Sequence, residues 1–109
     1  MSRLSLACSA IALALVSSLA TGRVALAADA ATIELYDKKC KTCHSIGGDA
    51  GKMADMGGTL DGVGSKRDAA WVGAYLADPK SKIPDGKMPP VPLTDDELAS
   101  LVEYMLSLK

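Results

Sequence analysis

Apolar side chains recur at helical spacing in three segments of the chain. In residues 32–39, Ile33 and Tyr36 fall on one face of a helix. Residues 68–78 begin with an aspartate, a common N-cap residue, and are followed by Pro79, which would interrupt a helix. The spacing therefore predicts a helix in each of these two segments.

The third segment, residues 94–108, has the clearest helix start. Thr94 and Glu97 have the spacing of a capping box, in which each side chain accepts the other residue's backbone N–H. No segment alternates apolar and polar residues as a half-buried strand would, and the glycine-rich stretch 47–64 is typical of a long loop. The chain is therefore expected to form an all-α domain with three main helices and long loops.

The N-terminus carries the features of a secretory signal peptide. Arg3 supplies a positive charge, residues 4–19 are apolar, and an Ala-Leu-Ala cleavage box ends at Ala27. Cleavage after Ala27 removes residues 1–27 and leaves residues 28–109 as one domain in the periplasm. A retained membrane anchor is the alternative, although the apolar stretch is short for a membrane span.

The exported part is close to the lower size limit for a domain whose core stands alone. The chain has no Phe, one Trp and three Tyr, so a bound apolar cofactor would supply volume that aromatic side chains do not. It carries 12 Lys plus Arg against 13 Asp plus Glu, and Arg3 and Arg23 both precede residue 28. The exported part is therefore acidic, which does not support nonspecific nucleic-acid binding.

The motif Cys-Lys-Thr-Cys-His at residues 40–44 carries the chemistry. In a helical turn, Cys40, Cys43 and His44 face one side and can meet one flat ligand. CxxCH is the pattern of covalent haem attachment, in which the thiols form thioethers and the imidazole binds the iron. The motif predicts one haem c, which bacteria attach outside the cytoplasmic membrane.

Two other chemistries use a CxxC motif. A thioredoxin-like disulfide exchanger would need alternating strands and helices around the motif, and the chain shows no such pattern. A structural zinc site needs four ligands, whereas the chain offers one histidine and, beyond Cys8 in the signal segment, only Cys40 and Cys43. Both alternatives are weaker than haem attachment.

A haem with two axial ligands needs one on the face opposite His44, and residues 28–109 offer four methionines, Met53, Met56, Met88 and Met105. Met105 lies on the apolar face of the last predicted helix, where core packing is the better interpretation. Met53 and Met56 follow His44 closely in the glycine-rich loop. Met88 lies farther along the chain and precedes two prolines that stiffen the backbone, so Met88 is the predicted distal ligand.

The chain resembles the small mono-haem class I cytochromes c over essentially the whole of residues 28–109. The resemblance is carried by the motif at residues 40–44, Leu60 and Gly62, and the runs 74–80, 82–90 and 101–105. It implies the cytochrome c fold, with Leu60 and Tyr75 in the haem pocket. It also implies that Tyr36 on the first helix packs against Leu101 and Tyr104 on the last.

The sequence departs from this family on the proximal side of the haem. Many members have a proline before the leucine, and the carbonyl of that proline orients the proximal histidine. This chain has Gly58 and Thr59 there instead. We expect a different backbone carbonyl to orient His44.

A second departure concerns Trp71, which does not coincide with the tryptophan that contacts a haem propionate in the mitochondrial relatives. Core filling is the better interpretation of Trp71. Lys66 and Arg67 are placed where a propionate partner would be useful, with solvated surface charge as the alternative.

The resemblance implies outer-sphere electron transfer between redox proteins and no enzymatic activity, because His44 and Met88 would occupy both axial positions. A haem enzyme or gas sensor, with Met88 displaced, is one alternative. A permanent subunit of a dehydrogenase or oxidase is another. Membrane contact is expected only through a partner or an uncleaved signal segment.

Partners are expected to dock transiently at the haem edge. Six lysines flank the haem motif and the Met88 segment: Lys38, Lys39, Lys41, Lys80, Lys82 and Lys87. If they ring the haem edge, a partner would present an acidic patch. A mixed, solvated surface is the alternative interpretation of these charges.

The dependence of the core on the cofactor gives a first prediction. We expect Cys40→Ala/Cys43→Ala protein without haem to be largely disordered, because folding and cofactor binding are coupled. Circular dichroism and a denaturation curve would measure this. A cooperative unfolding transition in the haem-free double variant would contradict the prediction.

Overall fold

The computed structural model describes residues 28–109. The expected signal peptide, residues 1–27, lies outside the described residues. Within the described part, none of the helices has the length and apolar character needed to cross a membrane.

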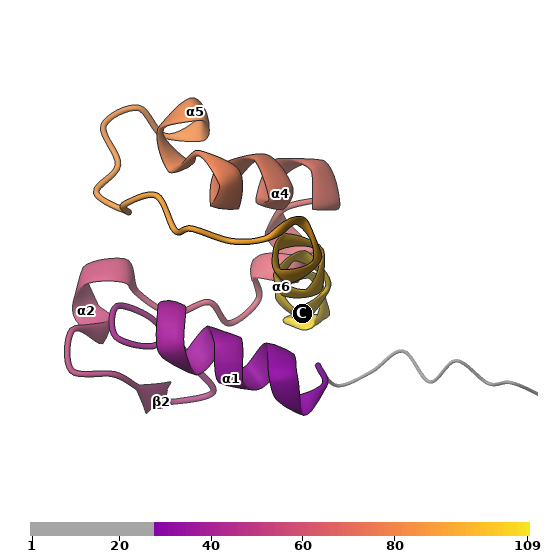
Figure 1. The fold of residues 1–109 in the computed structure, drawn as a ribbon. Helices are drawn as coiled ribbons and strands as arrows, with labels where there is room; N and C mark the ends of the chain where they lie inside the picture. Colours follow the sequence, from indigo (N-terminus) through magenta and orange to yellow (C-terminus); the bar gives the residue numbers. More distant parts are fainter. Residues whose placement is uncertain (1–27) are drawn as a thin grey trace, which may run out of the picture.

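Three longer helices are joined by segments that contain shorter elements (Figure 1). In chain order the elements are α1 (Ala30–Lys39), β1 (Ser45–Ile46), β2 (Asp49–Ala50), α2 (Ala54–Gly57), α3 (Val63–Lys66), α4 (Ala69–Ala77), α5 (Pro79–Lys82) and α6 (Asp95–Ser107). The expectation of an all-α domain with three main helices is confirmed, and α1, α4 and α6 are those helices.

The main helices begin where side chains can satisfy their free N–H groups. Asp29 accepts a hydrogen bond from the Thr32 N–H at 2.8 Å, so α1 starts two residues before the position that apolar spacing indicated. Asp68 caps α4 in the same way and accepts the Trp71 N–H at 2.8 Å. Helix α4 ends before Pro79, as predicted.

Helix α6 has the predicted capping box. The Thr94 hydroxyl accepts the Glu97 N–H at 3.1 Å, and the Glu97 carboxylate accepts the Thr94 N–H at 2.9 Å. Both hydrogen bonds are local in sequence, which is why the motif alone was sufficient to place this helix start.

The expected long loop at residues 47–64 contains more structure than its glycine content indicated. Strands β1 and β2 pair antiparallel across a turn at Gly47 and Gly48, which both have positive φ, and α2 and the start of α3 follow. Elements of two to four residues are too short to show a periodic pattern, so apolar spacing does not predict them.

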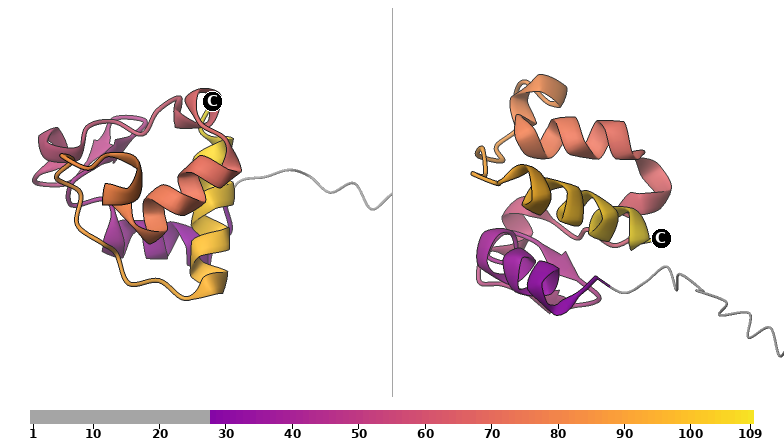
Figure 2. Two further views of the ribbon diagram at one scale, coloured as in Figure 1. Left: turned by 90° about the horizontal axis from the view of Figure 1, so that it is seen from above. Right: turned by 45° about the vertical axis from the view of Figure 1, so that its right-hand side comes forward.

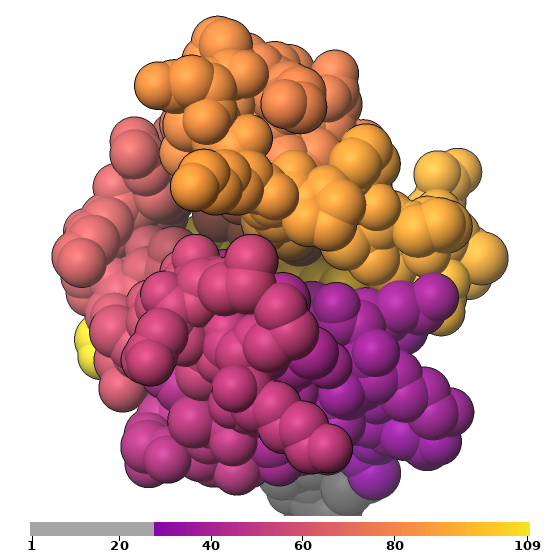
Figure 3. Space-filling model, turned by 90° about the vertical axis from the view of Figure 1, so that its left-hand side faces the viewer, coloured from indigo at the N-terminus to yellow at the C-terminus, as the bar shows by residue number. Residues whose placement is uncertain are grey.

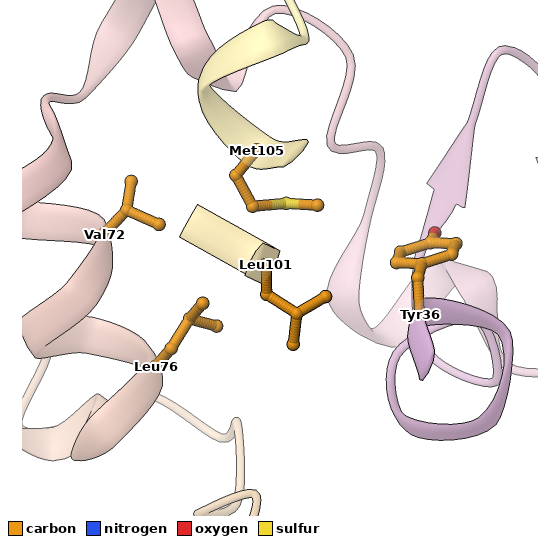
Figure 4. Close-up of a cluster of buried hydrophobic side chains, with 5 residues drawn as sticks. All are labelled: Tyr36, Val72, Leu76, Leu101 and Met105. Carbon is orange, nitrogen blue, oxygen red and sulfur yellow. The ribbon is translucent and has the colours of Figure 1, made fainter. Parts of the chain in front are cut away.

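Helix α6 lies between α1 and α4 (Figures 1 and 2). The buried hydrophobic cluster joins these three helices and consists of Tyr36, Val72, Leu76, Leu101 and Met105. Figure 4 shows Leu101 and Met105 of α6 between Tyr36 on one side and Val72 and Leu76 on the other. Leu101 is only 1% exposed. Helix α6 therefore carries the centre of the core.

The expected packing of α1 on α6 is confirmed. Tyr36 shares the buried cluster with Leu101, and its ring meets that of Tyr104 edge to face, with centroids 5.7 Å apart. Tyr36 is buried, and its hydroxyl has no hydrogen-bond partner among the described residues. Burial is the main cause that raises the pKa of Tyr36 to about 12.

The end of α6 is fixed to α3 by a close backbone contact. A side chain at Gly64 would collide with the Leu106 carbonyl, and the Gly64 N–H donates to the Leu108 carbonyl at 2.8 Å. The Lys109 ammonium in turn donates to the Gly64 carbonyl at 3.0 Å. This contact holds α3 against the end of α6.

The raised pKa of Tyr36 predicts a loss of stability at high pH. An unfolded tyrosine ionises near pH 10, whereas folded Tyr36 holds its proton to about pH 12, so the free energy of unfolding falls as pH rises between these values. We expect Tyr36→Phe to remove this part of the decline. Urea unfolding midpoints of the haem-loaded protein at pH 9 to 12 would measure it.

Tyr104→Phe is the matched control, since Tyr104 is only partly buried and should account for less of the decline. Equal effects of the two substitutions, or an undiminished decline in Tyr36→Phe, would contradict the assignment to Tyr36.

Candidate cofactor-binding site

A cavity of about 220 Å³ lies between the α1–α2 side of the molecule and the side formed by α4 and the segment after α5. In Figure 3 a recess separates the magenta α2 region from the orange segment above it, with α6 visible in its depth. Core residues of α4 and α6 form part of its wall, including Val72, Leu76 and Leu101. The cavity is therefore continuous with the hydrophobic core.

The structure brings most of the predicted site residues to this one cavity. They are Cys40, His44, Leu60, Tyr75 and Met88. Cys43 does not line it; this partly exposed residue lies on the turn between Cys40 and His44. The Cys40 carbonyl accepts the N–H groups of both Cys43 and His44 at 3.1 Å, so the motif forms a compact turn at the end of α1.

The imidazole of His44 is oriented by a backbone carbonyl, as expected. Its Nδ1 lies 3.1 Å from the carbonyl oxygen of Gly58. Because a carbonyl can only accept a hydrogen bond, Nδ1 carries the proton, and the unprotonated Nε2 is free to bind a metal. Gly58 thus supplies the backbone carbonyl that orients His44.

Gly57 lies directly against the imidazole. A Cβ atom at this position would lie 2.6 Å from Cε1 and 2.7 Å from Nδ1 of His44, and it would collide with the Cys43 carbonyl. The Gly57 N–H donates to that same carbonyl at 2.8 Å. Helix α2 therefore approaches the motif closely enough to hold His44 only because residue 57 has no side chain.

The methionines differ in their exposure and in whether they line the cavity. Met88 is partly buried and lines the cavity, whereas Met53 and Met56 are 46% and 64% exposed and do not line it. Met105 belongs to the buried cluster, which confirms its interpretation as a core residue, and its side chain also reaches the cavity wall.

The thiols do not suit disulfide exchange. Cys40 and Cys43 are both free, and burial raises the pKa of the Cys40 thiol to about 11. Exchange requires a thiolate, which a raised pKa disfavours at neutral pH. Within residues 28–109 no group of three or more His, Cys, Asp or Glu side chains could hold a metal ion, so a structural zinc site is not supported there either.

Trp71 has a second role beside core filling. It packs against the buried cluster, as expected, but it also lines the cavity and is partly exposed. Its ring stacks on Tyr75 with centroids 4.9 Å apart, and the Arg67 guanidinium lies 4.0 Å from its ring centroid. Sequence reasoning could have found the Trp71–Tyr75 pair, because the two residues are one turn apart in α4, whereas Arg67 lies before the start of that helix.

The residues present fit a covalently attached haem. The cavity offers an apolar wall for a porphyrin, a thiol at one edge, and an oriented imidazole and a thioether among its lining residues. The CxxCH motif predicts the thiol and the imidazole, and the choice of Met88 predicts the thioether.

Comparison with known proteins agrees with this geometry. A family model described as Cytochrome c matches residues 30–109. No curated protein and no solved structure gives a match.

The contact between Gly57 and His44 gives a prediction for the haem-loaded protein. Gly57→Ala should lower the free energy of unfolding by about 1–3 kcal/mol, because the added methyl group forces α2 away from the motif. Chemical denaturation monitored by haem absorbance would measure this.

Gly73→Ala is the matched control. A Cβ atom at residue 73 meets only Val102 Cγ2 at 3.8 Å, and alanine favours the α4 helix by up to about 1 kcal/mol. A Gly57→Ala protein as stable as Gly73→Ala would show that α2 does not constrain His44.

Proposed function

The chain belongs to the cytochrome c family, and on that premise we propose that it is a periplasmic electron carrier whose haem iron is bound by His44 and Met88. Membership of the family means that the protein binds haem c covalently and takes part in haem-based electron transfer. Cys40 and Cys43 stand in the CxxCH motif that forms the thioethers. The bound haem supplies one-electron chemistry through ferric and ferrous iron.

The single observation that carries the axial assignment is that His44 and Met88 line one cavity. They come from segments far apart in the sequence, on either side of α4 and α5. His44 keeps Nε2 free through its hydrogen bond to Gly58, and Met88 precedes two prolines that limit backbone movement. Both side chains are thus held in place, so that the iron would keep the same two ligands in its ferric and ferrous states.

The surroundings of the cavity favour the reduced state. A thioether ligand stabilises ferrous iron, and apolar walls such as Val72 and Leu101 disfavour the additional positive charge of ferric iron. These residues also exclude water from the iron. The protein should therefore accept electrons from moderately reducing donors.

The same residues argue against enzymatic chemistry. With both axial positions filled, a substrate has no site on the iron. His44 is the only histidine of the chain, and no carboxylate is among the cavity-lining residues of the described part, so an acid–base pair for peroxide chemistry is lacking there.

The structure reduces the number of lysines that could attract an acidic partner. Lys38 pairs with Glu34 at 2.7 Å and Lys41 pairs with Asp49 at 2.8 Å, so neighbouring carboxylates compensate these two charges. Of the six lysines that flank the haem motif and the Met88 segment, the other four, Lys39, Lys80, Lys82 and Lys87, are exposed and have no ion pair in residues 28–109. An acidic redox partner would accordingly dock on the side of α5 and the Met88 segment, through a small and transient interface.

The proposed ligand set predicts a specific spectroscopic effect. Met88→Ala should abolish the sulfur-to-iron charge-transfer band of the ferric protein and let the reduced protein bind carbon monoxide rapidly, because the sixth position loses its ligand. Absorption spectra with and without carbon monoxide would measure both effects.

Met53→Ala and Met56→Ala are the controls, since both side chains are exposed and lie outside the cavity lining. Loss of the charge-transfer band in either control would mean that the substituted methionine, and not Met88, binds the iron. Rapid carbon monoxide binding by the unaltered protein would instead favour a gas sensor or enzyme.

A further inference from the structure

The turn at α2 carries two methionines that neither the core nor the cofactor site uses. Met53 is 46% exposed and Met56 is 64% exposed. Neither side chain belongs to the buried cluster or packs against it, and neither lines the cavity. Since Met88 is partly buried and Met105 is buried, Met53 and Met56 are the exposed methionines of residues 28–109.

The backbone places these two side chains on the same side of one turn. The Met56 N–H donates to the Met53 carbonyl at 2.9 Å, which is a hydrogen bond between residues three apart. In such a turn the side chains at positions i and i+3 stand above each other, with Cβ atoms about 5–6 Å apart. Each thioether lies near the end of a flexible side chain, so both sulfur atoms can reach one small ion.

The turn is held against the haem-attachment motif. The Met53 N–H donates to the Thr42 carbonyl at 2.9 Å, and the Gly57 N–H donates to the Cys43 carbonyl at 2.8 Å. These two hydrogen bonds fix the backbone at both ends of the turn, so that an ion has to order only the two methionine side chains. A backbone that is already in place lowers the entropic cost of binding.

The charges of the turn do not favour a hard cation. Lys52 and Asp55 are both exposed, carry opposite charges and have no ion pair in residues 28–109. The same part of the chain contains no group of three or more His, Cys, Asp or Glu side chains that could hold a metal ion. Thioether sulfur, in contrast, is a soft ligand that selects Cu(I). The donor atoms therefore favour a soft monovalent ion over a divalent one.

We propose that Met53 and Met56 form a binding site for one Cu(I) ion on the surface of α2. The two thioethers are the protein ligands, and water completes the coordination. Because neither methionine lines the cavity, the site uses no group of the haem pocket. It is therefore a metal site in addition to the proposed axial pair.

The test uses the haem-loaded protein, isotope-labelled at the methionine methyl groups for NMR. Ag(I) is the probe for the ferric protein, because it shares the ligand preference of Cu(I) and does not reduce the haem. We expect one equivalent of Ag(I) to shift the methyl signals of Met53 and Met56 together and to leave that of buried Met105 unchanged. Zn(II) should shift none of them. Cu(I), added without oxygen to the ferrous protein, should reproduce the shifts.

Met53→Leu and Met56→Leu each remove one sulfur and keep the apolar volume. Each should lower the affinity for Ag(I) by at least about tenfold, which is the loss caused by removing even a group that only orients a metal ligand. The matched control is Asp55→Met/Met56→Leu, which keeps two thioethers but places them two residues apart, where they do not face each other. This double variant should bind as weakly as Met56→Leu. Asp55→Asn, which removes only the carboxylate, should bind nearly as tightly as the unaltered protein.

Undiminished affinity in the double variant, or independent shifts of the two methyl signals, would overturn the proposal, because single surface thioethers would then account for the binding. The sulfur-to-iron charge-transfer band of the ferric protein is recorded in the same titration. Loss of this band on addition of Ag(I) would mean that Met88 binds the ion, which would also overturn the proposal. Absence of the band before Ag(I) is added would instead count against the proposed function.

Discussion

Packing of one face of α6 between α1 and α4 is the interaction on which the structure depends. Leu101 and Met105 belong to the buried cluster and also line the cavity. The same side chains thus join the terminal helices and form part of the wall of the cofactor site. In so small a domain with few aromatic side chains, core and cofactor site cannot be separate volumes. This is the physical reason why folding and haem binding are expected to be coupled.

The two sides of the cavity are built by different means. On the proximal side, backbone contacts hold His44: the Gly58 carbonyl accepts from its imidazole, and Gly57 packs against the ring. On the distal side, Met88 lies in a segment without regular secondary structure, where prolines supply the stiffness. The two proposed axial ligands are therefore held by different means, the imidazole by a hydrogen bond and the thioether by covalent restriction of the backbone.

Several features were predictable because their physics is local. The helix caps at Asp68 and Thr94 depend on residues three positions apart, and both are as expected. The short elements within residues 47–64 were not predictable, because they rest on contacts between segments, such as the bridge between Ser45 and Thr59. Core filling alone is an incomplete interpretation of Trp71, since the sequence does not show that α4 turns this face toward a cavity.

The sequence by itself determined the cofactor chemistry and the starts of α4 and α6, and it singled out Met88, which lines the cavity, as the proposed ligand. These follow from residue types at short spacing, where the helical turn fixes which groups meet. Only the tertiary structure decided that Gly58 orients His44, that Asp49 compensates Lys41, and that Arg67 and Trp71 adjoin the cavity. Such contacts depend on the path of the backbone between segments, because residue type fixes what a group can bind and the fold fixes what it reaches.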